Sequence, residues 1–129
     1  MIQSMRPFSW KVAFLLILVV MFLIAHTVRH HFRIMTTRDT IGCVTVALDR
    51  TLGTKPLAKY NVVEETVKLF PEIRKSGNQI VDAWSNPLDI EIRAFDKVID
   101  VSITSAGPDG RFGTSDDLMK VVRLEMKPN

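Results

Sequence analysis

Hydrophobic and polar positions divide the chain into three parts with different spacings. The first part is a continuous apolar run over residues 12–25, which contains no charged residue, glycine or proline. Extended to residues 10–28, the run predicts a helix of about 28 Å at ~1.5 Å per residue. That length is enough to cross a hydrocarbon layer of ~30 Å when the flanking polar side chains reach back to the headgroups. The pattern therefore predicts an N-terminal stub over residues 1–11 and a transmembrane helix over residues 12–28.

A cleaved secretory signal and the buried core helix of a soluble protein are the alternatives to a membrane anchor. A cleaved signal needs small residues before the cut, but the only plausible exit, Leu23-Ile24-Ala25, begins with a bulky leucine. The length and the flanks of the run favour an uncleaved anchor. The distribution of Lys and Arg does not fix its orientation, because these residues flank the run on both sides.

The second part begins at Ile34, where apolar residues recur on one helical face. The residues with this spacing are Ile34, Ile41, Val44, Leu48 and Leu52. The alternation of Val44, Val46 and Leu48 also fits a strand, but length and continuity with the anchor favour a spine helix over residues 34–52. Gly53 and Pro56 are predicted to end this helix.

A shorter helix is predicted over residues 62–70. Asn61 followed by Glu64 resembles a capping box, and Pro71 breaks the apolar spacing that follows it. Ser76-Gly77-Asn78 then indicates a loop.

The third part has a period of two. Three segments alternate apolar and polar residues, at about 88–92, 99–103 and 122–126. Residues 95–98 are short enough for a tight hairpin, so the three strands are predicted to form an antiparallel sheet within residues 88–126. The fold class is therefore α+β, with the transmembrane and spine helix packed on a small antiparallel sheet. Residues 29–129 form the domain outside the anchor.

The charge of the chain changes along its length. The chain carries 17 Lys and Arg against 14 Asp and Glu, a formal net charge of +3. Residues 1–33 hold four of the basic residues and no acid, so the remainder has thirteen basic and fourteen acidic residues and a net charge of −1. The basic excess therefore flanks the membrane and does not form a nucleic-acid interface.

The cysteine and histidine content indicates no chemistry of its own. Cys43 is the single cysteine, so it is expected to be a core thiol. His26, His30 and His31 adjoin the membrane with no acid near them, which favours an interfacial cluster over a metal site. No nucleophile and base stand at a catalytic spacing, so neither an enzyme nor a small-molecule substrate is predicted.

Residues 107–117, between the second and third strands, combine three glycines with three acids, Asp109, Asp116 and Asp117. Carboxylates without histidine or thiolate suit Ca²⁺, although the spacing is not that of an EF-hand. The alternative is a solvated turn in which Asp and Gly serve turn geometry alone. The residues by themselves leave both interpretations open.

Two motifs resemble a known family. Asp82-Ala83-Trp84-Ser85-Asn86-Pro87 is followed by Ser105-Ala106-Gly107-Pro108-Asp109-Gly110. In this order the motifs resemble the major pseudopilin of bacterial type II secretion systems, which typically has Asp-x-Trp-Gly-Asn-Pro and then Ser-x-Gly-x-Asp-Gly. The resemblance covers residues 34–126, and Ser85 stands where the family has glycine.

The resemblance implies roles for the matching residues. Trp84 is expected to be an apolar anchor, and Asn86 and Pro87 are expected to form a turn that starts the first strand. Gly107 and Gly110 belong to the second motif. Because major pseudopilins bind calcium in the corresponding loop, the resemblance implies Ca²⁺ with Asp109 and Asp116 as first ligands, Asp117 as the third, and main-chain carbonyls completing the shell.

The N-terminus departs from the family. A pseudopilin begins with a prepilin-peptidase site, Gly-Phe-Thr-Leu-x-Glu, whereas Arg6-Pro7-Phe8-Ser9-Trp10-Lys11 stands here and the first acid is Asp39. The resemblance nevertheless implies a single-pass protein of the bacterial inner (cytoplasmic) membrane with an extracytoplasmic, periplasmic C-terminal domain.

Two functions remain open at this stage. The first is a pseudopilin-like structural subunit of a type II secretion or type IV pilus-like apparatus, whose partners are the membrane, other pseudopilin-like subunits and apparatus proteins. The alternative is a single-pass extracytoplasmic binding module that reuses the pilin-like fold and does not polymerise. The missing prepilin-peptidase site is the feature that separates them.

Overall fold

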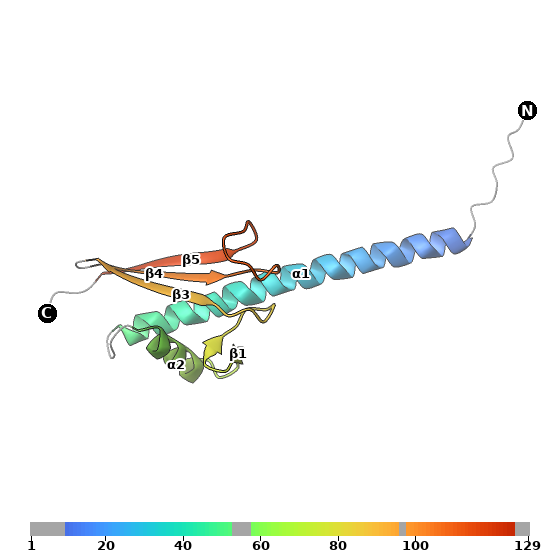
Figure 1. Ribbon diagram of the computed structural model, residues 1–129. Helices are drawn as coiled ribbons and strands as arrows, with labels where there is room; N and C mark the ends of the chain where they lie inside the picture. Colours follow the sequence, from blue (N-terminus) through green and yellow to red (C-terminus); the bar gives the residue numbers. More distant parts are fainter. Residues whose placement is uncertain (1–9, 53–57, 96–97, 126–129) are drawn as a thin grey trace, which may run out of the picture. The chain divides into compact units, whose positions relative to one another are not determined.

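The structure is a computed structural model that describes residues 10–52, 58–95 and 98–125 (Figure 1). The chain forms two compact units, Met1–Phe32 and Arg33–Asn129, and each is described by itself. The element order is two helices, a short two-stranded hairpin and a three-stranded sheet. The predicted α+β class is therefore confirmed.

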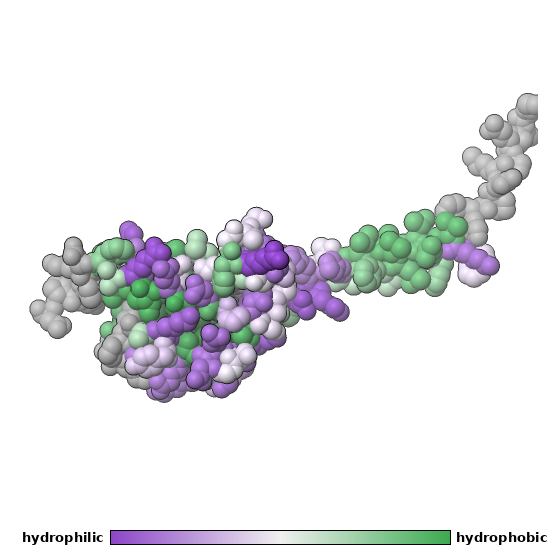
Figure 2. Space-filling view, in the orientation of Figure 1, coloured by the Kyte–Doolittle hydropathy of each residue, from purple (hydrophilic) through white to green (hydrophobic). Residues whose placement is uncertain are grey.

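Helix α1 (Trp10–Thr51) supplies the described part of the first unit. Its large apolar side chains between Trp10 and Phe32 are exposed, including every residue from Phe14 to Ile24, and Figure 2 shows the green surface that they form on the face in view. A helix with apolar side chains all round its circumference needs an apolar surrounding to cover them. As predicted, α1 is long and apolar enough to cross a membrane.

In the second unit α1 has one buried face. Its buried residues are Thr37, Thr40, Ile41, Val44, Ala47, Leu48 and Thr51. Val44 and Leu48, four residues apart, are fully buried, whereas Val46 between them is 53% exposed. This three-to-four spacing confirms the helix and excludes the strand that alternation at Val44, Val46 and Leu48 also fitted. The predicted stop at Gly53 and Pro56 lies outside the described residues.

Helix α2 (Lys59–Leu69) begins earlier than predicted. Its N-cap is Ala58, in an extended conformation and without a side-chain cap hydrogen bond, so the predicted cap at Asn61 is wrong. Asn61 and Val62 donate their N–H groups to the Ala58 carbonyl at 3.0 and 3.2 Å, which places Asn61 inside the first turn, where its side chain is buried. At the other end Phe70 leaves the helical conformation before Pro71, as predicted.

A small hairpin joins α2 to the sheet. Strands β1 (Lys75–Ser76) and β2 (Gln79–Ile80) pair antiparallel around the predicted 76–78 loop, with Gly77 at φ +56°. The left-handed backbone at Gly77 explains the glycine at this turn. Two-residue strands are too short to show any periodicity, so the sequence analysis did not find them.

The main sheet contains β3 (Asp89–Phe95), β4 (Val98–Ser105) and β5 (Leu118–Glu125), antiparallel in that order. The register pairs Ile92 with Val101 and Val101 with Val122, so apolar residues share one face. On the other face Arg123 donates to Asp100 through Nε at 2.8 Å. Both predicted faces are thus confirmed, and residues 96–97, where the hairpin turn is predicted, lie outside the described residues.

The inner face of the sheet and one face of α1 form the core. Its buried residues are Ile41, Val44 and Leu48 of α1, Val62 of α2, and Ile80, Leu88, Ile90, Ile99, Val101 and Ile103. Cys43 is only half-buried and does not join this cluster, so its prediction as a core thiol is wrong. Position 43 points away from the buried stripe formed by residues 41, 44 and 48. Burial, together with Glu72 and Asp39 nearby, raises the pKa of the Cys43 thiol.

Candidate functional site

The two family-like motifs meet at the carboxylate of Asp82. Asp82 Oδ1 accepts the main-chain N–H groups of Trp84 at 2.9 Å and Asn86 at 2.8 Å, and Oδ2 accepts the Ser105 hydroxyl at 2.7 Å. Asp82 and Ser105 are both fully buried. We call the hydrogen-bonded set of Thr37, Asp82, Asn86, Ser105 and Gly107 the polar junction.

The first motif is folded by its own aspartate. Asp82 donates its N–H to the Asn86 carbonyl at 2.9 Å, and Ser85 donates to the Asp82 carbonyl at 3.1 Å. A carboxylate that bonds N–H groups two and four residues ahead replaces a backbone turn, which is why aspartate opens this segment. Ser85 has φ +72°, the left-handed conformation that glycine adopts more readily, at the position where the family has glycine.

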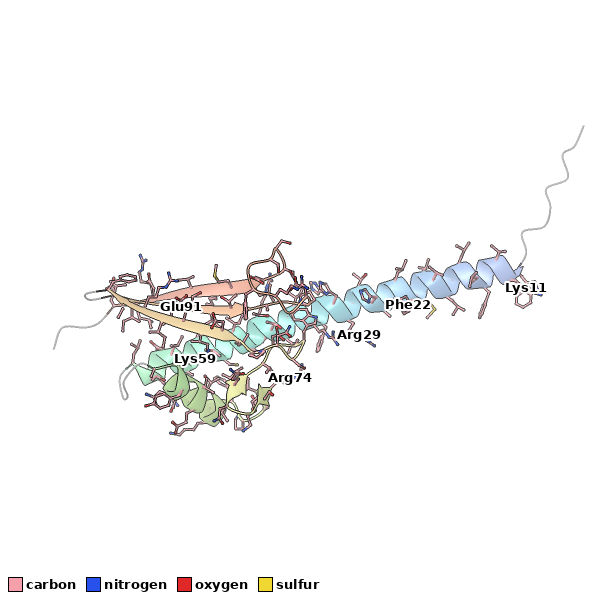
Figure 3. All side chains as sticks on the ribbon, in the orientation of Figure 1. Lys11, Phe22, Arg29, Lys59, Arg74 and Glu91 are labelled. Carbon is pink, nitrogen blue, oxygen red and sulfur yellow. The ribbon has the colours of Figure 1, made fainter. Side chains whose placement is uncertain are left out.

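Arg74 supports this turn from the segment before the β1–β2 hairpin (Figure 3). Its guanidinium donates Nη1–H to the Ala83 carbonyl at 3.1 Å and Nη2–H to Ser85 Oγ at 3.0 Å. The second bond requires the serine hydroxyl. Ser85, which stands where the resembled motif has glycine, therefore makes a contact that glycine at this position would not make.

The junction also reaches α1. Ala83 donates its N–H to Thr37 Oγ1 at 3.1 Å, and Thr37 is fully buried on the sheet-facing side of the helix. Sequence reasoning missed Thr37, and it also missed the role of Asp82 as an acceptor for Ser105. The available signal was a threonine on the buried face of the spine, because buried polar side chains are found with hydrogen-bond partners.

The second motif closes on the first through Asn86 and two glycines. Asn86 Nδ2 donates to the Gly107 carbonyl at 2.8 Å, and Gly107 donates its N–H to Ser105 Oγ at 3.2 Å. Gly107 has φ +63°, and a Cβ there would overlap the main-chain carbonyl of Asp116, so only glycine fits. Gly110, at φ +68°, faces the Asn86 side chain. The structure thus brings together the predicted residues Asn86, Gly107 and Gly110.

Trp84 and Pro87 lie at the edge of this arrangement. Pro87 is exposed and forms an isolated bridge with Val81 two residues before β3, which fits its predicted place in the turn. Trp84 is half-buried, and among the described residues the core cluster contains Ile80 and Leu88 but not Trp84. The apolar anchoring of this segment therefore falls mainly to Ile80 and Leu88.

The three loop acids accept hydrogen bonds from the loop itself. Asp109 Oδ1 accepts the Arg111 N–H at 2.8 Å. Asp116 Oδ2 accepts the Asp109 N–H at 3.2 Å, and Asp117 Oδ2 accepts the Gly113 N–H at 2.7 Å. The Thr114 hydroxyl lies 2.5 Å from Asp116 Oδ1, and this bond lowers the pKa of the Asp116 carboxyl. Asp116 is therefore the acid at the centre of the loop.

The predicted calcium ligands already accept hydrogen bonds within the loop. Within residues 10–52, 58–95 and 98–125, no group of three or more His, Cys, Asp or Glu side chains is arranged to hold a metal ion. Loop N–H groups and the Thr114 hydroxyl share the carboxylate oxygens that a cation would need. Calcium at Asp109, Asp116 and Asp117 therefore stays a prediction, and binding would have to rearrange these hydrogen bonds.

Calcium is expected to raise the melting temperature of the protein. A cation that binds only the folded loop stabilises it by ~2.7 kcal/mol when its free concentration is a hundred times its dissociation constant. For a domain of this size the gain corresponds to roughly 10 °C, at about 4–8 °C per kcal/mol. The measurement compares melting of the detergent-solubilised chain in millimolar Ca²⁺ and in a chelator, with Mg²⁺ expected to substitute poorly.

Two aspartate variants make this test specific. Asp116→Ala should remove most of the calcium-dependent difference, whereas Asp100→Ala, which changes a sheet carboxylate bonded to Arg123, should preserve it. An unchanged wild-type melting temperature in chelator at low salt, with no bound metal in the purified protein, would show that the loop is held only by its own hydrogen bonds.

Comparisons with protein-family models, with curated proteins and with solved structures find no match to this chain.

Proposed function

We propose that this protein is a membrane-anchored, pseudopilin-like structural subunit of, or associated with, a bacterial type II secretion or type IV pilus-like apparatus. The observation that carries the proposal is the Asp82–Ser105 hydrogen bond, which joins the two family-like motifs inside one domain. The polar groups of the two motifs make hydrogen bonds to each other within the domain. Such residues hold a shape, and a structural subunit needs a defined shape.

The arrangement of helix and sheet supports the same function. A helix that is apolar all round its N-terminal part continues as the spine of a small antiparallel sheet. In this proposal the apolar part holds the chain in the bacterial inner membrane, and the domain is extracytoplasmic, where it meets other subunits or apparatus proteins. Neither nucleic acid nor a small-molecule substrate is a partner.

Cross-linking in native membranes tests this proposal. The exposed lysines Lys59, Lys68, Lys75 and Lys120 provide sites for an amine-reactive cross-linker. A structural subunit should give a ladder of multiples of the chain mass, or products with other pilin-like subunits, identified by mass spectrometry. A single product between one copy and an unrelated extracytoplasmic protein or surface polymer would favour the non-polymerising binding module instead.

The proposed topology gives a separate prediction. Alkaline phosphatase fused after Asn129 should be active, because that enzyme matures only outside the cytoplasm, while a cytoplasmic reporter at the same position should be silent. The measurement is the ratio of the two reporter activities in whole cells. The reverse ratio would place residues 33–129 in the cytoplasm and contradict an extracytoplasmic subunit.

A further inference from the structure

Three basic side chains gather on one side of α1 where its apolar part ends. At ~3.6 residues per turn, His26, Arg29 and His30 lie within about 100° of one another, whereas His31 lies about 150° from their centre. All four side chains are exposed. Helix residues three and four apart have Cβ atoms about 5–6 Å from each other, so the first three residues share one small area. We call His26, Arg29 and His30 the basic face.

The first unit supplies no acid to the basic face. The first Asp or Glu of the chain is Asp39, so residues 10–32, the described part of this unit, contain no carboxylate side chain. Asp39 follows Arg29 by ten residues, which is about 15 Å of helix. Opposite charges attract each other more strongly beside a hydrocarbon layer than in water, because the dielectric constant there is lower. An anion that neutralises the basic face at close range therefore comes from outside the unit.

The place of the basic face along α1 matches the phosphate level of a membrane. Residues 10–28 cover about 28 Å, close to the thickness of a ~30 Å hydrocarbon layer, and the basic face begins in the last turn of this stretch. Toward the N-terminus on the same side of the helix, Val19 and Phe22 are 48% and 70% exposed. Figure 3 labels Phe22 and, beyond it, Arg29. This side of α1 thus presents an apolar stripe and then a basic face, in the order of the acyl chain and phosphate of a lipid.

We propose that the basic face binds the phosphate of one anionic phospholipid, whose acyl chains lie along the apolar stripe of Val19 and Phe22. The guanidinium of Arg29 suits a phosphate, because its planar fork donates two parallel N–H groups to two oxygens. The imidazoles of His26 and His30 add N–H donors from the same turn. A cation among the imidazoles, with no carboxylate or thiolate, favours an anion over a metal ion. This inference rests on the membrane anchor of the proposed function and adds a ligand to it.

The test is native mass spectrometry of the detergent-solubilised full chain, titrated with phosphatidylglycerol and separately with phosphatidylcholine. Both lipids carry a phosphate, but phosphatidylcholine also carries an ammonium group that the basic face repels. The wild-type chain should therefore retain one phosphatidylglycerol molecule with about tenfold higher affinity. Millimolar inorganic phosphate should not displace this lipid, because a free anion has no acyl chains to cover the apolar stripe. Displacement by phosphate, or equal retention of the two lipids, would overturn the proposal.

Two neighbouring histidines provide a matched pair of variants. His30→Ala removes a donor from the basic face and should weaken phosphatidylglycerol binding by about three- to tenfold. His31→Ala removes the same side chain from another side of the helix and should leave binding within about twofold of wild type. Arg29→Gln removes the permanent charge and should abolish the preference for phosphatidylglycerol over phosphatidylcholine. Equal losses in His30→Ala and His31→Ala would show a general attraction by the whole flank and would overturn the proposed site.

The outcomes distinguish this inference from the proposed function. Equal retention of the two lipids by a chain that gives a cross-linking ladder would remove the lipid site alone. Selective retention of phosphatidylglycerol by a chain that gives neither a ladder nor a product with pilin-like subunits would support the lipid site and contradict the structural subunit. Release of the chain from native membranes by alkaline carbonate would contradict the membrane anchor, on which both depend.

Discussion

Replacing Asp82 with alanine should lower the free energy of unfolding by about 3–5 kcal/mol. The change leaves the N–H groups of Trp84 and Asn86 and the hydroxyl of Ser105 without their acceptor. An unsatisfied buried donor costs about 1–3 kcal/mol, and the hydroxyl is fully buried. The measurement is urea unfolding of the detergent-solubilised full chain, followed by near-ultraviolet circular dichroism, which reports tertiary packing of the domain.

Two further variants show that the effect belongs to the polar junction. Asp89→Ala removes an exposed carboxylate that pairs with Lys59 at 3.7 Å, so it should cost under about 1 kcal/mol. The cost of Asp82→Asn should lie between those of Asp82→Ala and Asp89→Ala, because the amide keeps one oxygen for the N–H groups but presents its own N–H to Ser105. Equal costs for Asp82→Ala and Asp89→Ala would show that the junction does not stabilise the fold.

Ile103→Ala should cost about 2–4 kcal/mol, through lost burial and the cavity left behind. Ile103 is fully buried in β4, the central strand, and belongs to the core cluster between the sheet and α1. Neighbouring side chains of a central strand are held by pairing on both sides, so they cannot collapse into the space. The same unfolding experiment measures the loss.

A pair of identical substitutions provides the control. Val101 and Val121 lie on adjacent strands of the same sheet, but Val101 is fully buried and Val121 is 58% exposed on the outer face. Val101→Ala should therefore cost clearly more than Val121→Ala, which should stay within about 0.5 kcal/mol of wild type. A larger loss at Val121 would mean that the outer face of the sheet is the covered one.

The helix and sheet could be predicted because their periodicities repeat over many residues. The spine shows seven buried positions on one face, β4 alternates over all its eight residues, and β3 and β5 each alternate over five. Local signals were less reliable. The Asn61 and Glu64 spacing matches a capping box, but burial of Asn61 in the first turn of α2 overrides the local preference. The β1–β2 hairpin has too few residues for any pattern.

The candidate site was predicted as two motifs and not as a network. Gly107 and Gly110 could be predicted because the turns there need a left-handed backbone, and Asn86 could be predicted because its motif resembles that of the pseudopilins. The hydrogen bonds from Ser105 to Asp82 and from Ala83 to Thr37 join residues 23 and 46 positions apart. No spacing rule encodes which polar side chains meet across such separations, because the packing of α1 on the sheet determines it.

These sequence separations also affect the order in which the domain becomes stable. A contact between residues 46 positions apart requires closure of a long loop before it contributes anything, so it forms late and together with its neighbours. The junction takes Thr37 from α1, Asp82 and Asn86 from the 82–86 turn, Ser105 from the end of β4 and Gly107 from the loop that follows. A chain that ends before Ser105, because it has been cut or is still being synthesised, therefore contains Asp82 without the Ser105 hydroxyl that bonds to its carboxylate in the complete domain. Incomplete copies should remain open to proteases, and only a finished domain becomes resistant.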